Sequence, residues 1–213
     1  YIPLKHSSEK TLNKEKVLEK LKPLFEDNSI KKIGQNIKYD YIVLFRQGII
    51  LNPIEDTMLM SYALDAGSHR HNMDYLSEIH LEHKTITYKD VVGIGKNQIS
   101  FNQVPISRAT EYSAEDADVT FRLYKNFSKR LKHEKLINIY ELFEKPLVRL
   151  LAEMEIKGIK IDNIFLKRLS QKFDLNIKNL EKKIFSITKN EFNIGSPKQL
   201  GEMMYNKLKI SKL

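Results

Sequence analysis

The stretch Glu111-Tyr112-Ser113-Ala114-Glu115-Asp116-Ala117-Asp118 lies inside a helical pattern that spans about residues 107–132. Tyr112 and Asp116 are four positions apart, so a helix places both on one face. The other residues of that face are small or apolar: Ala109, Ser113, Val119, Thr120 and Leu123. Such a face packs against the rest of a protein and holds a phenol and a carboxylate at the edge of a core, a setting that suits chemistry. The alternative is an ordinary helix with a hydrogen-bonded tyrosine and a solvated acid.

Composition limits the class of protein. The chain has 213 residues, of which 41% are hydrophobic and 30% are charged, so it can bury a core. It has no apolar run long enough to cross a bilayer, and its first residues lack the charged-then-apolar layout of a signal peptide. Cysteine is absent, which rules out disulfides and thiolate metal sites and fits a reducing compartment. We therefore expect no membrane partner.

Positive charge is concentrated in the last two-fifths of the chain. Residues 1–127 contain 17 basic and 17 acidic side chains, whereas residues 128–213 contain 19 basic and 10 acidic ones. A basic segment attached to a neutral one indicates a polyanionic partner. The alternative is that lysines simply decorate solvated helices.

The order of the predicted elements indicates an α/β architecture followed by helices alone. Strands are predicted at residues 1–4, 30–33 and 49–51. Helices are predicted at residues 11–27, 34–48, 57–66, 72–81, 107–132, 136–156, 162–189 and from 196 onward. The alternation over residues 30–66 is typical of an α/β layer. The change to helices alone, together with the charge shift, predicts two domains, at residues 1–130 and 131–213.

Two short motifs on separate predicted helices, Asn36-Ile37-Lys38-Tyr39-Asp40 and Tyr112-Ser113-Ala114-Glu115-Asp116, resemble the second and third motifs of the proofreading 3′–5′ exonuclease domain of bacterial DNA polymerase I. Further segments follow in that family's order and spacing, at residues 56–59, 70–74, 83–87, 95–98, 144–148 and 158–162. The ordered set covers essentially the whole chain. The resemblance implies an α/β, ribonuclease H-like 3′–5′ exonuclease fold in residues 1–130, followed in residues 131–213 by an all-α segment that resembles the base of the polymerase thumb.

The resemblance also implies a two-metal site. The family cuts phosphodiester bonds with two divalent ions held by carboxylates, and Mg²⁺ or Mn²⁺ suits such oxygen ligands. By resemblance, Asp116 ligates the ion that activates water, and Tyr112 orients that water. Asp40 serves the second ion, directly or through water.

DNA is the implied partner. By resemblance, the single-stranded 3′ end lies near Gln35, Asn36, Arg70 and Tyr88. Tyr88 stands where the family often has phenylalanine, and either ring could stack on a base. The basic helices, including Lys167 and Arg168, would contact duplex phosphates as the family's thumb does.

One motif of the family is missing from the sequence. No Asp is followed two positions later by Glu, so the family's first motif, Asp-x-Glu on a strand, does not occur. We therefore expect a sheet without its first two strands, an incomplete two-metal site, and little or no exonuclease activity from these 213 residues alone. The chain would belong to a larger cytoplasmic nucleotidyltransferase, with the remaining polymerase domains as partners in DNA replication and repair. The alternatives are a non-catalytic DNA-binding or scaffold module and an RNA-trimming exonuclease of the same superfamily.

A second possible metal site comes from His80 and His83, which are three positions apart at a predicted helix end. Two histidines so spaced are also typical of an ordinary helix surface. The sequence leaves both interpretations open.

Overall fold

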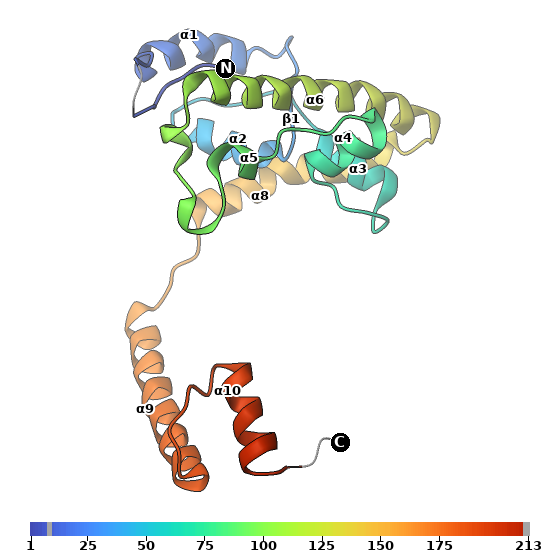
Figure 1. The fold of residues 1–213 in the computed structure, drawn as a ribbon. Coiled ribbons are helices and arrows are strands. Elements are labelled where there is room, and N and C mark those ends of the chain that lie inside the picture. Colours follow the sequence, from blue (N-terminus) through green and yellow to red (C-terminus); the bar gives the residue numbers. More distant parts are fainter. Residues whose placement is uncertain (8–9, 211–213) are drawn as a thin grey trace. The chain divides into compact units, whose positions relative to one another are not determined.

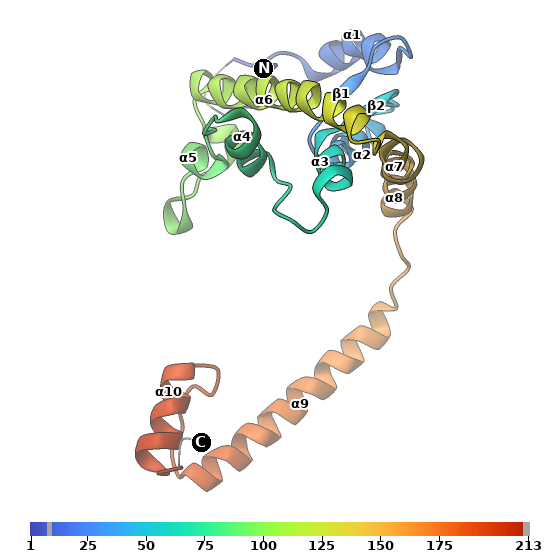
Figure 2. The ribbon, with the colours of Figure 1, turned by 90° about the vertical axis from the view of Figure 1, so that its right-hand side faces the viewer.

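The computed structural model describes residues 1–7 and 10–210. The chain divides into two compact units, Tyr1–Gly158 and Ile159–Leu213. Figures 1 and 2 show the ribbon from two directions, coloured along the sequence, with the second unit in orange to red. None of the helices in the described residues is long and apolar enough to cross a membrane.

The first unit combines a small parallel sheet with helices. Its strands are β1 (Lys32–Gly34) and β2 (Ile54–Asp56), which pair with Lys32 opposite Ile54 and Gly34 opposite Asp56. The helices are α1 (Lys14–Glu26), α2 (Ile37–Phe45), α3 (Thr57–Asp65), α4 (Met73–Leu81), α5 (Tyr88–Val92), α6 (Ile106–His133), α7 (Ile137–Ile139) and α8 (Lys145–Lys157). Short 3₁₀ turns occur at Gly95–Asn97 and Phe101–Gln103. The first unit is therefore mostly helical.

Helix α6 packs against α3, α4 and α5 in the first unit, and Figure 1 shows its course. Val119, Leu123, Phe127 and Leu131 recur every four positions and are fully buried, so they form one apolar stripe. The stripe packs on Met60 of α3 and Leu76 of α4. A second cluster joins α2 to α8 through residues that are all almost fully buried: Ile37, Tyr41, Leu51, Val148 and Ala152. The predicted long helix is confirmed within one residue at each end.

Two predicted strands were wrong. Ile49 and Leu51 are buried core residues, yet the strand that pairs with β1 lies later, at residues 54–56. Residues 1–4 form no strand, and Pro3 instead accepts a hydrogen bond from the Leu12 N–H at 3.0 Å. A short apolar run shows burial but not pairing, and pairing needs a neighbouring strand.

The helix predicted over residues 136–156 is interrupted. A π-helical turn, Tyr140–Glu144, separates α7 from α8, and Pro146 lies in the first turn of α8. Proline cannot donate a backbone N–H to the preceding turn, so the hydrogen-bond register changes just before it.

The first compact unit extends beyond the domain boundary predicted at residues 130 and 131. Tyr140, Val148 and Ala152 are buried in the clusters of the first unit, so residues 131–158 pack with it. The division between units falls at Gly158, where φ is 69°.

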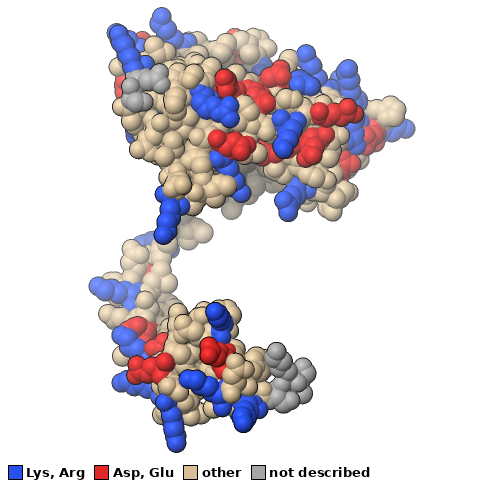
Figure 3. Space-filling view, in the orientation of Figure 1, with Lys and Arg blue, Asp and Glu red and all other residues tan. Residues whose placement is uncertain are grey.

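The regular elements in the described residues of the second unit are all helical, as predicted. Its elements are α9 (Asn163–Thr188), α10 (Pro197–Gly201) and a π-helical turn at Glu202–Lys207. Asp162 caps α9 by accepting the Phe165 N–H at 2.9 Å. Residues 159–213 contain 12 basic and 5 acidic side chains, and Figure 3 shows Lys and Arg spread over one face of this unit.

Candidate functional site

Asp40 of α2 and Asp116 of α6 line one hollow of about 370 Å³. The remaining lining residues come from the end of β1 and from α4 and α6: Ile33, Gly34, Gln35, Met73, Ala117 and Thr120. Two helices that are far apart in the sequence thus direct one carboxylate each into the same space.

The start of α2 is held in place by Asp56. The Asp56 carboxylate accepts the backbone N–H groups of Asn36 at 3.0 Å and Ile37 at 3.0 Å, at the start of α2. It also accepts the N–H of Met58 at 2.9 Å, in the first turn of α3. One buried carboxylate therefore caps two helices, and it sets the position of Asp40 in the first turn of α2. The sequence left the cap of α3 open between Asp56 and Thr57 and gave no sign of the α2 contact.

The electrostatic surroundings of Asp116 favour a bound cation. Burial is the largest cause that raises the pKa of Asp116, a hydrogen bond from Tyr112 lowers it, and the neighbouring carboxylates of Asp74 and Glu115 raise it; together they give a pKa of about 6. The Asp116 Oδ1 atom is buried and has no hydrogen-bond partner among the described residues. A buried oxygen without a partner is costly, and a divalent ion would compensate it.

Asp40 experiences a similar environment. Its side chain is accessible to solvent, yet the surrounding protein displaces enough water to raise the pKa of its carboxyl group. The nearby charge of Asp56 acts in the same direction. Two carboxylates whose pKa values are raised by their surroundings, placed along one hollow, fit the oxygen donor set that Mg²⁺ or Mn²⁺ prefers.

Tyr112 belongs to an aromatic group beside this hollow. Its ring centroid lies 6.0 Å from that of Phe101 and 6.3 Å from that of Tyr88. Burial and the charge of Asp116 raise the pKa of Tyr112, so its hydroxyl stays protonated and can donate a hydrogen bond at neutral pH. The structure therefore brings together Tyr88 and Tyr112, which are 24 positions apart in the printed sequence.

The other predicted DNA-contacting residues differ in how far they are already engaged. Gln35 lines the hollow, but its amide donates to the His71 carbonyl at 2.7 Å and accepts from the Thr57 hydroxyl at 2.5 Å. Asn36 has a left-handed φ of 57°, and its side chain makes no capping bond. Arg70 is exposed in the loop between α3 and α4.

Lys167 and Arg168 lie elsewhere in the chain, exposed on α9 of the second unit. No residue of α9 takes part in the first unit's hollow described above.

Asp74 was not among the predicted site residues, although its charge raises the pKa values of both Asp116 and Tyr112. Asp74 lies in the first turn of α4, and its carboxylate accepts the Thr85 hydroxyl at 2.7 Å. An acid in a first helical turn is commonplace because it interacts well with the helix dipole. The place of Asp74 in the sequence therefore gave no sign that it lies near Asp116.

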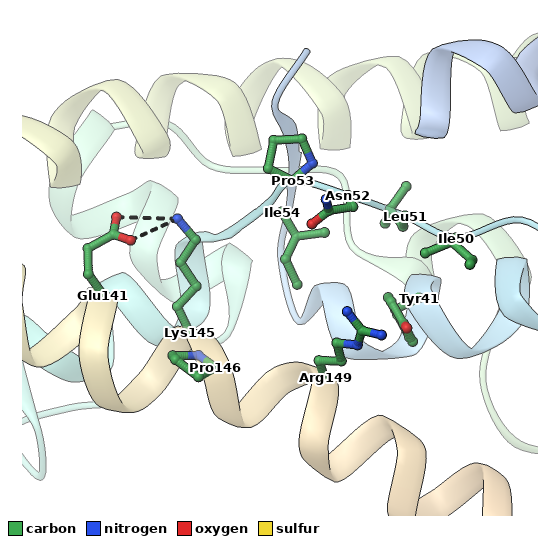
Figure 4. A pocket seen from close by; sticks show the side chains of 10 residues that line it. All are labelled: Tyr41, Ile50, Leu51, Asn52, Pro53, Ile54, Glu141, Lys145, Pro146 and Arg149. Atoms are coloured by element: carbon green, nitrogen blue, oxygen red, sulfur yellow. Dashed lines mark hydrogen bonds and ion pairs between the residues drawn. The ribbon is translucent and has the colours of Figure 1, made fainter. Parts of the chain in front are cut away.

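A separate hollow of about 250 Å³ lies between α2, residues 50–54 and the start of α8, as Figure 4 shows. Its Lys145 forms ion pairs with Glu141 and with the buried Glu55, both at 3.0 Å. Neither Asp40 nor Asp116 lines this space. Arg149, which also lines this hollow, pairs through its Nε with Glu153 at 2.9 Å.

Comparison with known proteins connects this geometry with a family. Residues 1–132 match the family model described as 3′-5′ exonuclease. The chain is 48% identical over 194 residues to DNA polymerase I of Rhizobium leguminosarum, covering 91% of this chain and 19% of that protein. It is 40% identical over 215 residues to DNA polymerase I of Pseudomonas aeruginosa, covering 98% of this chain and 24% of that protein. The chain thus spans about a fifth to a quarter of the length of these relatives.

A solved structure shares the fold. It is the POL domain of Pol1 from M. smegmatis, in complex with DNA primer-template and dNTP. The TM-score is 0.67 at 21% sequence identity, and the likeness covers 97% of this chain and 32% of that one.

Proposed function

The chain belongs to the 3′–5′ exonuclease family, and from that premise we propose that it serves the proofreading activity of a DNA polymerase I. The proposed reaction removes the last nucleotide from a single-stranded 3′ end of DNA. The names of the relatives favour this function over the RNA-trimming alternative.

The observation that carries the proposal is the shared hollow of Asp40 and Asp116. These two carboxylates would hold the divalent ions, Mg²⁺ or Mn²⁺, and the unpartnered Oδ1 of Asp116 is the atom most in need of a cation. When bound, such ions lower the pKa of water and stabilise the leaving oxygen of a phosphodiester. Asp116, with a pKa of about 6, is mostly ionised at neutral pH and so is ready to bind.

The residues around the carboxylates would position the substrate. The protonated Tyr112 hydroxyl would orient the attacking water. Tyr88 is 47% exposed, and its ring would stack on a base at the 3′ end. Arg70 would contact a phosphate, and Gln35 and Asn36 would lie beside the terminal nucleotide.

We further propose that residues 1–130 form a ribonuclease H-like exonuclease domain and residues 131–213 the start of a polymerase domain. In the described residues, β1 pairs with β2 on one side only, and the family's Asp-x-Glu strand would be expected along its other side. With Asp40 and Asp116 but not that motif, the 213-residue chain by itself would trim DNA slowly or not at all.

Ion binding tests the proposal without requiring catalysis. Mn²⁺ bound to the chain is measured by electron paramagnetic resonance for the wild type and for Asp40→Asn, Asp116→Asn and Asp118→Asn. Asp118 is a matched control because it lies on the same helix but is exposed and paired with Arg122 at 3.6 Å. We expect Asp116→Asn and Asp40→Asn to weaken binding by about 10-fold or more, and Asp118→Asn to leave it unchanged.

Equal Mn²⁺ affinity in all four proteins would contradict the proposed site. If the four proteins had equal Mn²⁺ affinity and still bound single-stranded DNA, the chain would be better described as a non-catalytic DNA-binding scaffold. Robust Mg²⁺-dependent trimming by the 213 residues alone would instead show that the first motif is dispensable.

A further inference from the structure

A second group of metal-ligating side chains lies at the other end of α6 from Asp116. Asp65 ends α3, His69 lies in the following loop, and His80 lies in the last turn of α4. Their candidate ligand atoms all lie within 4.8 Å of one another. Asp65 is held by Arg130, which is 14 residues from Asp116 along α6 and thus about 21 Å away along the helix axis. We propose that Asp65, His69 and His80 form a binding site for a transition-metal ion such as Zn²⁺, separate from the proposed exonuclease site.

The ring of His69 is arranged as a ligand. Its Nδ1 atom lies 2.9 Å from the carbonyl oxygen of Arg70, so Nδ1 carries the proton and Nε2 presents a lone pair. The Nε2 atom lies 3.8 Å from Asp65 Oδ2, which is too far for a hydrogen bond. Metal-bound histidines typically donate their other ring N–H to a carbonyl or carboxylate in this way.

His80 supplies an independent indication. Its Nε2 atom is buried and has no hydrogen-bond partner among the residues that the structure describes. The ring stands edge-on to Phe127, with centroids 5.0 Å apart and planes at 89°, so its orientation is set by packing. Burial lowers the pKa of His80, which keeps the ring neutral and able to bind a metal. A bound ion would satisfy a nitrogen that otherwise has no partner.

Arg130 determines how strongly Asp65 can bind. Its guanidinium donates to Asp65 at 3.0 and 3.3 Å and lowers the pKa of that carboxyl group, so Asp65 stays ionised. Each carboxylate oxygen retains a lone pair for an ion. The positive charge of Arg130 opposes a cation, but Glu134 accepts its Nε–H at 2.8 Å and offsets that charge.

The donor set identifies the class of ion. Two imidazoles and one carboxylate suit Zn²⁺ and its neighbours, whereas Mg²⁺ prefers oxygen alone. Ligands about 2.1 Å from a tetrahedral ion stand roughly 3.4 Å apart, so the three side chains would close by about 1 Å. The ion has an entry path, since the Asp65 side chain is 27% exposed, and water would complete the coordination.

A bound ion would join α3, α4 and the loop between them. That loop also carries Arg70 and His71, and the His71 carbonyl is held by Gln35. The proposed ion would therefore stabilise the folded first unit.

Zn²⁺ binding to the chelator-treated chain tests this site, measured by competition with a chromophoric chelator in excess Mg²⁺. The variants are His69→Ala, His80→Ala and Asp116→Asn, with His133→Ala as the matched control because His133 is an exposed histidine outside the cluster. We expect one Zn²⁺ per chain in the wild type, His133→Ala and Asp116→Asn. We expect a loss of more than about 100-fold in His69→Ala and His80→Ala.

Co²⁺ added in place of Zn²⁺ should give the visible absorption bands of a four-coordinate site in the wild type. His69→Ala and His80→Ala should not show these bands. Equal Zn²⁺ affinity in His69→Ala and His133→Ala would overturn the proposal. His69 lies in an exposed loop, so that comparison holds even if His80→Ala fails to fold. Loss of Zn²⁺ in Asp116→Asn would also overturn it, by placing the ion at the other site.

Discussion

Asp116 carries a charge that its surroundings disfavour, because burial raises the pKa of its carboxyl group. An unfolded aspartate has a pKa of about 3.9, whereas folding raises that of Asp116 to about 6. Between these two pH values the Asp116 carboxyl group binds its proton more tightly in the folded protein than in the unfolded chain. The contribution of Asp116 to stability is therefore full at pH values below the unfolded pKa, and it is lost as the pH rises through about 6.

Asp116→Asn should consequently stabilise the metal-free protein at pH 8, by on the order of 2 kcal/mol, and have little effect at pH 4. Nine of the ten tyrosines lie in the first unit, so urea unfolding followed by tyrosine fluorescence reports on it. Asp118→Asn serves as the control, because Asp118 lies on the same helix and is exposed. A constant stability difference between pH 4 and pH 8 would argue against a raised pKa at Asp116.

At the scale of elements, Asp56 connects the site to the fold. It caps α2 and α3 together, so the direction of Asp40 depends on a residue that does not line the hollow. Asn13 offers a simple comparison, since it caps α1 through a single bond from the Lys16 N–H at 2.9 Å.

Asp56→Ala should lower the free energy of unfolding by about 3 kcal/mol, because three backbone N–H groups, one of them buried, lose their acceptor. Asn13→Ala should cost about 1 kcal/mol. The same urea measurement compares them, and Mn²⁺ binding should weaken only in Asp56→Ala. Similar losses in both variants would mean that the double cap contributes no more than an ordinary one.

At the scale of the whole molecule, the two units differ in charge. The first unit is nearly balanced, and the second has more than twice as many basic as acidic side chains. Such a distribution favours phosphate contacts by the second unit, where affinity falls steeply with salt as counterions are released.

Replacing Lys167 and Arg168 by Gln should weaken duplex DNA binding and reduce the slope of log affinity against log salt by about 2. Fluorescence anisotropy between about 50 and 200 mM salt measures that slope. Lys14→Gln with Lys20→Gln is the matched control on α1, where both lysines are exposed. If the two pairs changed the slope equally, the DNA contact would be a general effect of charge.

Much of the local structure could be predicted from residue spacing alone. The family that the comparison confirmed was instead predicted from the resemblance of the two motifs and of the segments ordered with them. The face that carries Val119, Thr120 and Leu123 predicted α6, and Asp162 marked the start of α9. These features are local because helix periodicity and capping depend on residues within a few positions.

Contacts across the chain were decided by the tertiary structure. The amino-acid sequence by itself determined most of the helices, the basic segment at residues 128–213, and the two motifs with their aspartates. Only folding decided that β1 pairs with residues 54–56 and not 49–51, that Asp56 caps α2, and that His80 meets Asp65 and His69 instead of His83. The physical reason is that periodicity specifies which face of an element is apolar, whereas packing specifies which distant element covers that face.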